Sequence, residues 1–176
     1  MSLIGRALAA SLLMLAITAH AEKLGYQNWV ADLNGKSNEA YTANDPQSSF
    51  GVYCASEKCL FYLHQALKCD PGTKYSVLMN SQTVSTALSM ECSQIGGNLF
   101  QILDPFEAVL RAAQSGEMIG FAVALQSGAF AVTRFSLAGA KPAIERVLVE
   151  AANSKLKEQK SPVEKPQKAP PKDISI

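Results

Sequence analysis

Apolar and polar residues alternate along two short segments on either side of residues 55–58, which is the pattern of two antiparallel strands joined by a tight connection. If Cys54 lies opposite Cys59, the antiparallel register also places Val52 opposite Phe61. These cross-strand pairs share one face. The pattern therefore predicts a hairpin whose apolar row and first cysteine pair point to the same side.

Similar patterns predict further strands, separated by turn signals. Residues 70–72 read Asp-Pro-Gly, in which proline sets the first central angle of a turn and glycine permits a positive φ at the second. Residues 126–128 separate two apolar runs, which predicts a second hairpin with Arg134 opposite Gly120. Both faces of that hairpin are apolar, and we expect both to be buried. The strands expected from these patterns are residues 26–33, 75–79, 85–92, 98–103, 118–125 and 129–137.

Two segments have the apolar spacing of amphipathic helices. The first follows Asp104, a suitable N-cap, with Pro105 at the first helical position and Glu107 at the position of a capping box. The second has Pro142 in its first turn. Their apolar faces are expected to pack on the sheet, and they consist of residues 106, 109, 110 and 113 in the first helix and residues 143, 144, 147, 148 and 151 in the second.

The segment between the first two predicted strands is polar. We expect residues 34–49 to form an exposed loop, because Asn34 and Gly35 signal a turn and Asp45-Pro46 breaks regular structure. Trp29, on the strand before it, is expected to anchor the core.

All four cysteines lie between Cys54 and Cys92, and the other two are Cys59 and Cys69. Four cysteines allow three connectivities, and the sequence alone does not choose between them. We expect pairs between Cys54 and Cys59 and between Cys69 and Cys92. Zinc binding is disfavoured because the cysteines do not form two closely spaced pairs. No metal and no cofactor is therefore expected.

Both ends of the chain differ from its middle in composition. Residues 1–21 contain Arg6, a short apolar run and small residues before a cleavage point, as in a secretory signal peptide, so we expect the mature chain to begin at Glu22. Residues 22–153 are expected to form one β-rich globular domain. Residues 154–176 are rich in Lys and Pro and are expected to be a disordered tail. Export to the periplasm or beyond fits the even number of cysteines.

Charge and titratable residues limit the function. The net charge of +1 argues against nucleic acid as a partner, and membrane contact is expected at most through the basic tail. Two residues are candidates for binding. Arg134 has room for its guanidinium over Gly120 and would bind an anion, although a carboxylate of the same chain is the favoured partner. His64 is the candidate for a base, but its position on a strand face favours a packed or surface residue.

Several features occur together in this chain. They are the exported length, the close pair Cys54 and Cys59, the strand with Trp29, and residues 135–139 (Phe-Ser-Leu-Ala-Gly) followed by an apolar helix. Together they resemble the invasion-associated locus B family of Gram-negative bacteria. The resemblance implies a small β-rich protein of the periplasm or cell surface, with some members linked to host-cell invasion and with no established catalytic mechanism. The tail and residues 69–72 depart from the family pattern, and no functional residue is carried over.

The sequence as a whole predicts an α+β fold, with an antiparallel sheet or sandwich, two helices packed on it and two disulfides. It favours a non-enzymatic binding or accessory protein, periplasmic or secreted, that acts on another protein of the bacterial envelope or of a host. The alternative is an envelope hydrolase or an inhibitor of one. Catalysis is disfavoured because the mature chain has one histidine, few aspartates and no recognisable nucleophile motif.

Overall fold

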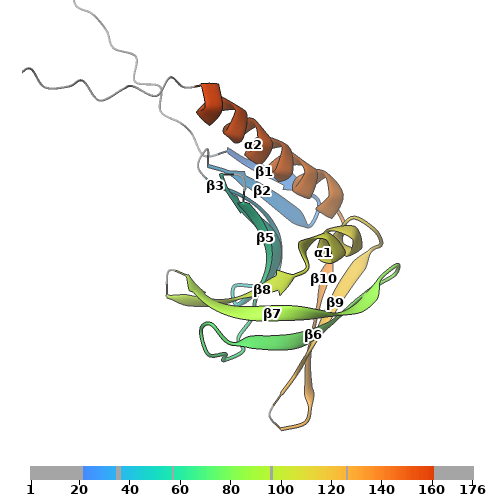
Figure 1. The fold of residues 1–176 in the computed structure, drawn as a ribbon. Helices are drawn as coiled ribbons and strands as arrows, with labels where there is room; N and C mark the ends of the chain where they lie inside the picture. Colours follow the sequence, from blue (N-terminus) through green and yellow to red (C-terminus); the bar gives the residue numbers. More distant parts are fainter. Residues whose placement is uncertain (1–21, 35–36, 57, 96, 126, 161–176) are drawn as a thin grey trace, which may run out of the picture.

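The computed structural model describes residues 22–34, 37–56, 58–95, 97–125 and 127–160, which form ten strands and two helices (Figure 1). The first five strands are β1 (Glu22–Tyr26), β2 (Trp29–Leu33), β3 (Ser37–Asp45), β4 (Ser48–Ala55) and β5 (Lys58–His64). The next three are β6 (Lys74–Ser81), β7 (Ser85–Ile95) and β8 (Asn98–Asp104). The chain continues with α1 (Phe106–Ala113), β9 (Met118–Ala124), β10 (Phe130–Ser136) and α2 (Ala140–Lys160).

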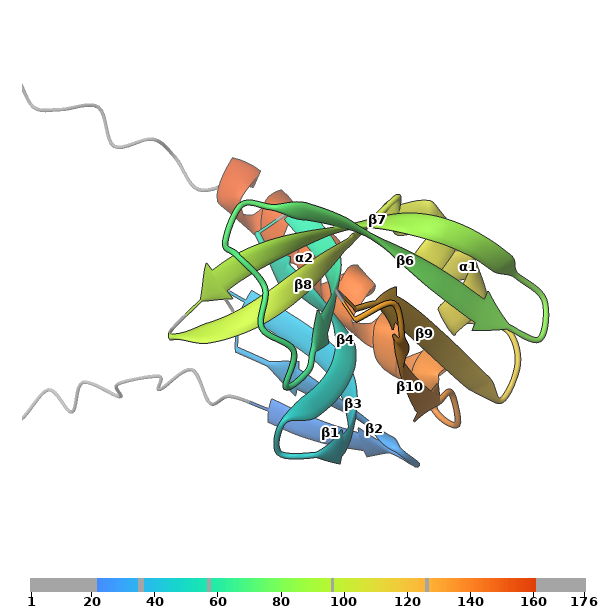
Figure 2. The same cartoon turned by 90° about the horizontal axis from the view of Figure 1, so that it is seen from below.

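All ten strands belong to one antiparallel sheet, in the order β1-β2-β3-β4-β5-β8-β7-β6-β9-β10. The sheet is open and strongly curled, so that β6 and β7 run across the direction of β3 and β4 (Figure 2). The predicted α+β class with two helices on the sheet is confirmed. Of the two arrangements expected from the sequence, the single sheet is the one that forms.

The core fills the inner face of this curled sheet around Phe50 of β4. The ring centroid of Phe50 lies 5.7 Å from that of Trp29, 5.9 Å from Phe61, 5.2 Å from Phe121 and 5.8 Å from Phe135. These five side chains come from β2, β4, β5, β9 and β10 and are almost fully buried. The expected role of Trp29 as a core anchor is confirmed, and aromatic packing joins the two ends of the sheet.

The helices lie where their apolar faces meet the sheet. α2 packs mainly against β1 to β4. Of its predicted apolar face, Ala143, Ile144, Val147 and Ala151 are buried and Leu148 is partly buried, and Ala140 at the start of the helix is buried as well. α1 packs against β8, β5 and β6 and buries Val109 and Ala113. The β9–β10 hairpin projects away from α2, so its tip lies at the opposite end of the molecule (Figure 1).

Both predicted disulfides are confirmed. Cys54–Cys59 closes the β4–β5 hairpin with its Cα atoms 4.1 Å apart, in the register expected from the alternation. Cys69–Cys92 ties the turn before β6 to β7 with a Cα–Cα distance of 6.0 Å. The turn itself is closed by the Thr73 amide, which donates to the Asp70 carbonyl at 3.0 Å. The two disulfides are consistent with an oxidising compartment outside the cytoplasm.

The prediction of a loop over residues 34–49 is wrong, because Ser37–Asp45 form β3 in the middle of one half of the sheet. The strand buries Asn38, Ala40 and Thr42 in alternation, and two of these three residues are polar. Because these residues are polar, hydrophobic periodicity does not reveal the strand. Its structure is determined by pairing with β2 and β4 on its two sides.

Two element boundaries also differ from the prediction. The strand expected over residues 26–33 begins only at Trp29. Before it, Gln27 and Asn28 form the tight turn that connects β1 to β2. Asp104 is not an N-cap, because it ends β8 opposite Ser89, and α1 begins after Pro105 without a side-chain capping bond. Because Asp104 pairs with β7 as the last residue of β8, it does not cap the helix.

The predicted domain boundaries lie near the two ends of the described residues. Residues 1–21 and 161–176 lie outside the described residues, and with them the predicted signal peptide and most of the predicted tail. α2 continues to Lys160, past Ser154, the first residue of the predicted tail. The first residues of the Lys-rich segment therefore extend a helix that starts on the sheet.

Candidate functional site

Arg134 lies on the outer face of the sheet, opposite the core, on the last strand. The predicted register is confirmed, since Arg134 pairs with Gly120 of β9 and Gly120 pairs in turn with Asn80 of β6. A Cβ atom at Gly120 would lie 3.6 Å from Cγ of Arg134, so the arginine stem rests on the glycine backbone. The missing side chain of Gly120 lets the guanidinium lie close to the sheet.

Arg134 lines a shallow groove of about 750 Å³ over β6, β9, β10 and the start of β7. Among the described residues that line it, Arg134 is the only charged one. The rest of the lining is apolar or neutral, and its most exposed apolar side chains are Leu78 at 52%, Val132 at 54% and Met118 at 44%. A single cation beside an apolar surface favours a ligand that combines an anionic group with apolar neighbours.

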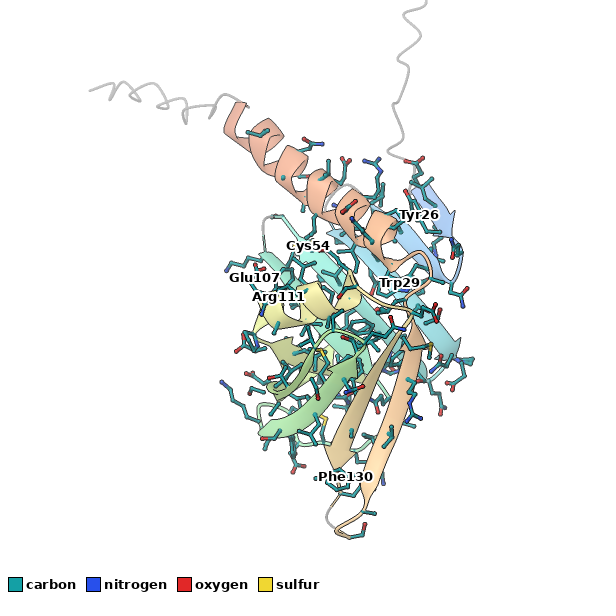
Figure 3. All side chains as sticks on the ribbon, turned by 90° about the vertical axis from the view of Figure 1, so that its right-hand side faces the viewer. Tyr26, Trp29, Cys54, Glu107, Arg111 and Phe130 are labelled. Carbon is teal, nitrogen blue, oxygen red and sulfur yellow. A yellow bond between two sulfur atoms is a disulfide. The ribbon has the colours of Figure 1, made fainter. Side chains whose placement is uncertain are left out.

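The expectation that both faces of the β9–β10 hairpin are buried is wrong. The inner face is buried, with Ile119, Phe121 and Phe135 in the core. The outer face is open to solvent, and Phe130 at the hairpin tip is 58% exposed (Figure 3). Since no second layer of described residues covers this face, its apolar side chains form a surface strip.

Among the residues that the structure describes, no carboxylate lies beside Arg134, where the sequence favours one. The ion pairs among the described residues involve Lys23, Lys74 and Arg146, and in none of them does an acidic group lie within 4.0 Å of Arg134. The carbonyl of Arg134 accepts a hydrogen bond from the Asn44 side chain at 2.8 Å, which fixes the backbone at this point. The guanidinium is therefore held in place by its strand and remains exposed.

His64, the second candidate, has a structural environment. Its Nδ1 atom lies 3.0 Å from the carbonyl oxygen of Leu99, and its ring centroid lies 5.0 Å from that of Phe100. It lines a depression at the end of β5 that shares no residue with the groove at Arg134. The structure does not bring the two candidates together, and His64 fits the expected role of a packed strand residue.

A third feature, which the sequence analysis missed, lies on the outer face of β3, β4 and β5. The hydroxyl of Tyr62 is hydrogen-bonded to the carboxylate of Glu39. Burial raises the pKa of Glu39, and this hydrogen bond opposes the rise. Burial, together with the neighbouring Glu39, raises the pKa of Tyr62. Tyr62 therefore keeps its proton and acts as the donor.

The Glu39–Tyr62 pair lines an apolar depression of about 210 Å³. The remaining lining residues are Tyr53, Leu60, Ile95, Phe100 and Ile102. Sequence patterns do not reveal the pair, because Glu39 belongs to the strand whose polar composition predicts a loop. The arrangement holds a carboxylate in apolar surroundings, which makes it sensitive to pH.

We expect Glu39→Gln to stabilise the protein at neutral pH. A folded-state pKa above the ordinary value of 4.5 means that the folded protein binds the proton more tightly than the unfolded chain does. Stability is then lost as the pH rises from about 4.5 through the raised pKa, and the loss persists above it. Glutamine keeps an acceptor for Tyr62 and carries no charge, so denaturant titrations of this variant should show a flatter pH profile.

The control for this experiment is Glu145→Gln, which alters an exposed glutamate of α2. Its pH profile should follow that of the parent protein. If Glu39→Gln were no more stable than the parent at neutral pH, the half-buried carboxylate would not have the destabilising effect assigned to it. Asp32, which pairs with Glu39 across β2 and β3 and raises its pKa, is unchanged in both variants.

Similarity searches found no matching family model, curated protein or solved structure. Within the described part of the chain, no group of three or more His, Cys, Asp or Glu side chains is placed to hold a metal ion. In the same residues, no helix has both the length and the apolar character needed to cross a membrane.

Proposed function

We propose that the protein is an exported, non-enzymatic binding protein that recognises another protein, of the bacterial envelope or of a host, through the outer face of β6, β9 and β10. The observation that carries this proposal is the exposed apolar strip of Leu78, Val132 and Phe130, which ends at the guanidinium of Arg134. Exposed apolar patches beside a positioned charge are typical of protein-binding surfaces. Periplasmic or secreted localisation is part of the proposal.

The proposal also retains membership of the invasion-associated locus B family. Two of the features on which the resemblance rests contact each other, since Trp29 Nε1 donates to the Ser136 carbonyl at 2.8 Å. The amide of Asn28 donates to the Ala138 carbonyl at 3.1 Å in the same place. These contacts join two of the features on which the resemblance rests, and they assign no binding residue.

Site-specific photo-cross-linking tests the binding surface. A photoreactive amino acid is placed at Val132 or, as a matched control, at Val149 of α2, because both side chains are 54% exposed. In cells that export the protein, we expect a discrete cross-linked product from position 132 only, and we expect Arg134→Glu to abolish it. Equal products from both positions, or none from position 132, would contradict the proposed surface.

A further inference from the structure

The sheet has two edge strands, and they are protected to different degrees. On β1, Lys23 forms an ion pair with Asp32 at 3.0 Å, and Glu22 lies 4.0 Å from Arg146 of α2. Charged side chains and a covering helix are two devices that prevent unwanted pairing at a sheet edge. β10 has Arg134 as its single charged residue. α2 packs on β1 to β4, at the opposite end of the strand order, and does not cover β10 (Figure 1).

Hydrogen bonds at the two ends of β10 show which of its backbone groups face β9. The amide of Leu125 donates to the carbonyl of Ala129 at 2.8 Å, and the amide of Leu137 donates to that of Glu117 at 2.7 Å. Since backbone groups alternate in direction along an antiparallel strand, the odd-numbered residues of β10 pair with β9. The N–H and C=O groups of the even-numbered residues point to the open edge.

Side chains from β2 and β3 close one half of this edge. Asn44 Nδ2 donates to the carbonyl of Arg134 at 2.8 Å, and Trp29 Nε1 donates to that of Ser136 at 2.8 Å. For the two even-numbered residues nearest the hairpin turn, no hydrogen-bond partner of the edge-facing backbone groups exists among the described residues. That half of β10 is an open strand edge.

The side chains at these two positions are Phe130 and Val132, which are 58% and 54% exposed. Val132 pairs with Ala122, and Ala122 pairs with Leu78 of β6, so the apolar strip continues across the outer face. Arg134 follows Val132 on the same face. An added strand would therefore place side chains beside two apolar positions and one cationic position in succession.

The inner side of the same edge carries an unsatisfied amide. The Thr133 hydroxyl donates to Oε1 of Gln65 at 3.0 Å, whereas Nε2 of Gln65 has no acceptor among the described residues although the residue is only 7% exposed. Gln65, Thr133 and Ala131 line a groove of about 250 Å³ beside the edge. A buried donor without an acceptor is costly, so a carbonyl or small polar side chain in this groove would be favoured.

We propose that the open half of β10 accepts an extended segment of the partner protein as an additional antiparallel strand, which deepens and rests on the proposed binding function. The backbone of this segment pairs with β10 only at the open positions Phe130 and Val132. An acidic residue that precedes this paired part directs its carboxylate to the Arg134 guanidinium, and apolar residues two and four positions later lie beside Val132 and Phe130. Small polar residues occupy the intervening positions and face Gln65. The backbone hydrogen bonds supply affinity, and the alternate side chains supply specificity.

Charge complementarity favours a different protein over a second copy of this chain. Two β10 strands paired across a twofold axis would bring no acid to Arg134, because residues 118–136 contain no aspartate or glutamate. The acidic residue of the segment pairs with the guanidinium in the groove at Arg134, which has no other charged residue in its described lining. Asp45 lines the second groove, beside Gln65, where the segment carries uncharged side chains. The segment that covers β10 is thus expected to differ in sequence from β10 itself.

The test uses the exported protein with both disulfides formed and a capped peptide in which glutamate is followed by valine at the second and fourth positions, with threonine between. We expect saturable binding by fluorescence anisotropy. Hydrogen exchange at the amides of Phe130 and Val132 should slow on binding, because their N–H groups become hydrogen-bonded. Arg134→Glu should weaken binding at least about tenfold, and a peptide with lysine in place of glutamate should restore it.

Two further variants separate strand addition from general adhesion. Val132→Pro removes an edge-facing donor without breaking a bond to β9, so it should abolish binding while the fold is retained. Lys141→Glu makes the same charge change as Arg134→Glu at an exposed site on α2 and should leave binding unchanged. If Val132→Pro does not fold, the charge exchange at Arg134 and the hydrogen exchange of the parent protein still decide the question.

Other occupants of the edge give different results. Binding only after removal of residues 161–176 would mean that the chain's own tail covers β10, and a dimer lost in Val132→Pro would mean a second copy. Either result overturns the proposal, as does the absence of binding or binding unaffected by Arg134→Glu. A cross-link from Val132 combined with unprotected β10 amides would overturn strand addition and leave the proposed binding function standing.

Discussion

Phe50→Ala is expected to destabilise the folded protein by about 3–5 kcal/mol, the range for removing a buried phenylalanine. Phe50 is fully buried, and its ring packs against Trp29, Phe61, Phe121 and Phe135. Truncation removes the apolar surface that the ring buries and leaves a cavity between the two halves of the sheet. Because the four neighbours come from four strands, no single movement can close it.

Phe130→Ala is the control, because it makes the same chemical change at a side chain that is 58% exposed. Surface substitutions usually change stability by no more than about 0.5 kcal/mol, so this variant should unfold close to the parent protein. Chemical denaturation of both variants measures the difference. Equal losses would mean that Phe50 does not hold the curled sheet together.

The parts of the fold that could be predicted from the sequence depend on local signals. The β4–β5 and β9–β10 hairpins follow from alternating residues around short connections, and their registers are as expected. The disulfide Cys69–Cys92 is predictable because a turn sequence at Asp70 precedes one strand and Cys92 lies on the next. In each case the contacting residues are close in sequence or joined by a recognisable turn.

The parts that could not be predicted depend on contacts between distant segments. β3 has polar residues, Asn38 and Thr42, at buried positions, and only its neighbours in the sheet explain their burial. The order of the strands after β5, in which β8 precedes β7 and β6, has no local signal. The sequence pattern also cannot show that β10 is an edge strand, and therefore it predicts a buried outer face.

Only part of the candidate site could be predicted from the sequence. The approach of Arg134 to Gly120 follows from hairpin register, so the sequence locates the cation correctly. The absence of a carboxylate partner among the described residues, the apolar strip with Leu78 and the open backbone at Val132 depend on which strands adjoin the hairpin. The Glu39–Tyr62 pair depends on β3 and is hidden from the sequence for the same reason.

Gly139→Ala is the second substitution for which we expect a large loss, of at least about 4 kcal/mol. Gly139 precedes α2 and has a φ of +89°, which side chains rarely adopt. A Cβ atom there would also overlap the backbone carbonyl of Tyr26 at the β1–β2 turn. This turn is bonded to the same segment through the Asn28 amide and the Ala138 carbonyl.

Gly128→Ala separates the two causes of that loss. Gly128 has a φ of +81°, and no described atom lies within 4 Å of the position that a Cβ would take, so its substitution incurs the backbone cost alone, about 1–2 kcal/mol. The additional loss at Gly139 measures the overlap, which only a separation of α2 from the β1–β2 turn can relieve. If the denaturant midpoints of the two variants agree within error, the overlap at Gly139 is relieved without a loss of stability. In that case α2 is not fixed to the sheet through Gly139.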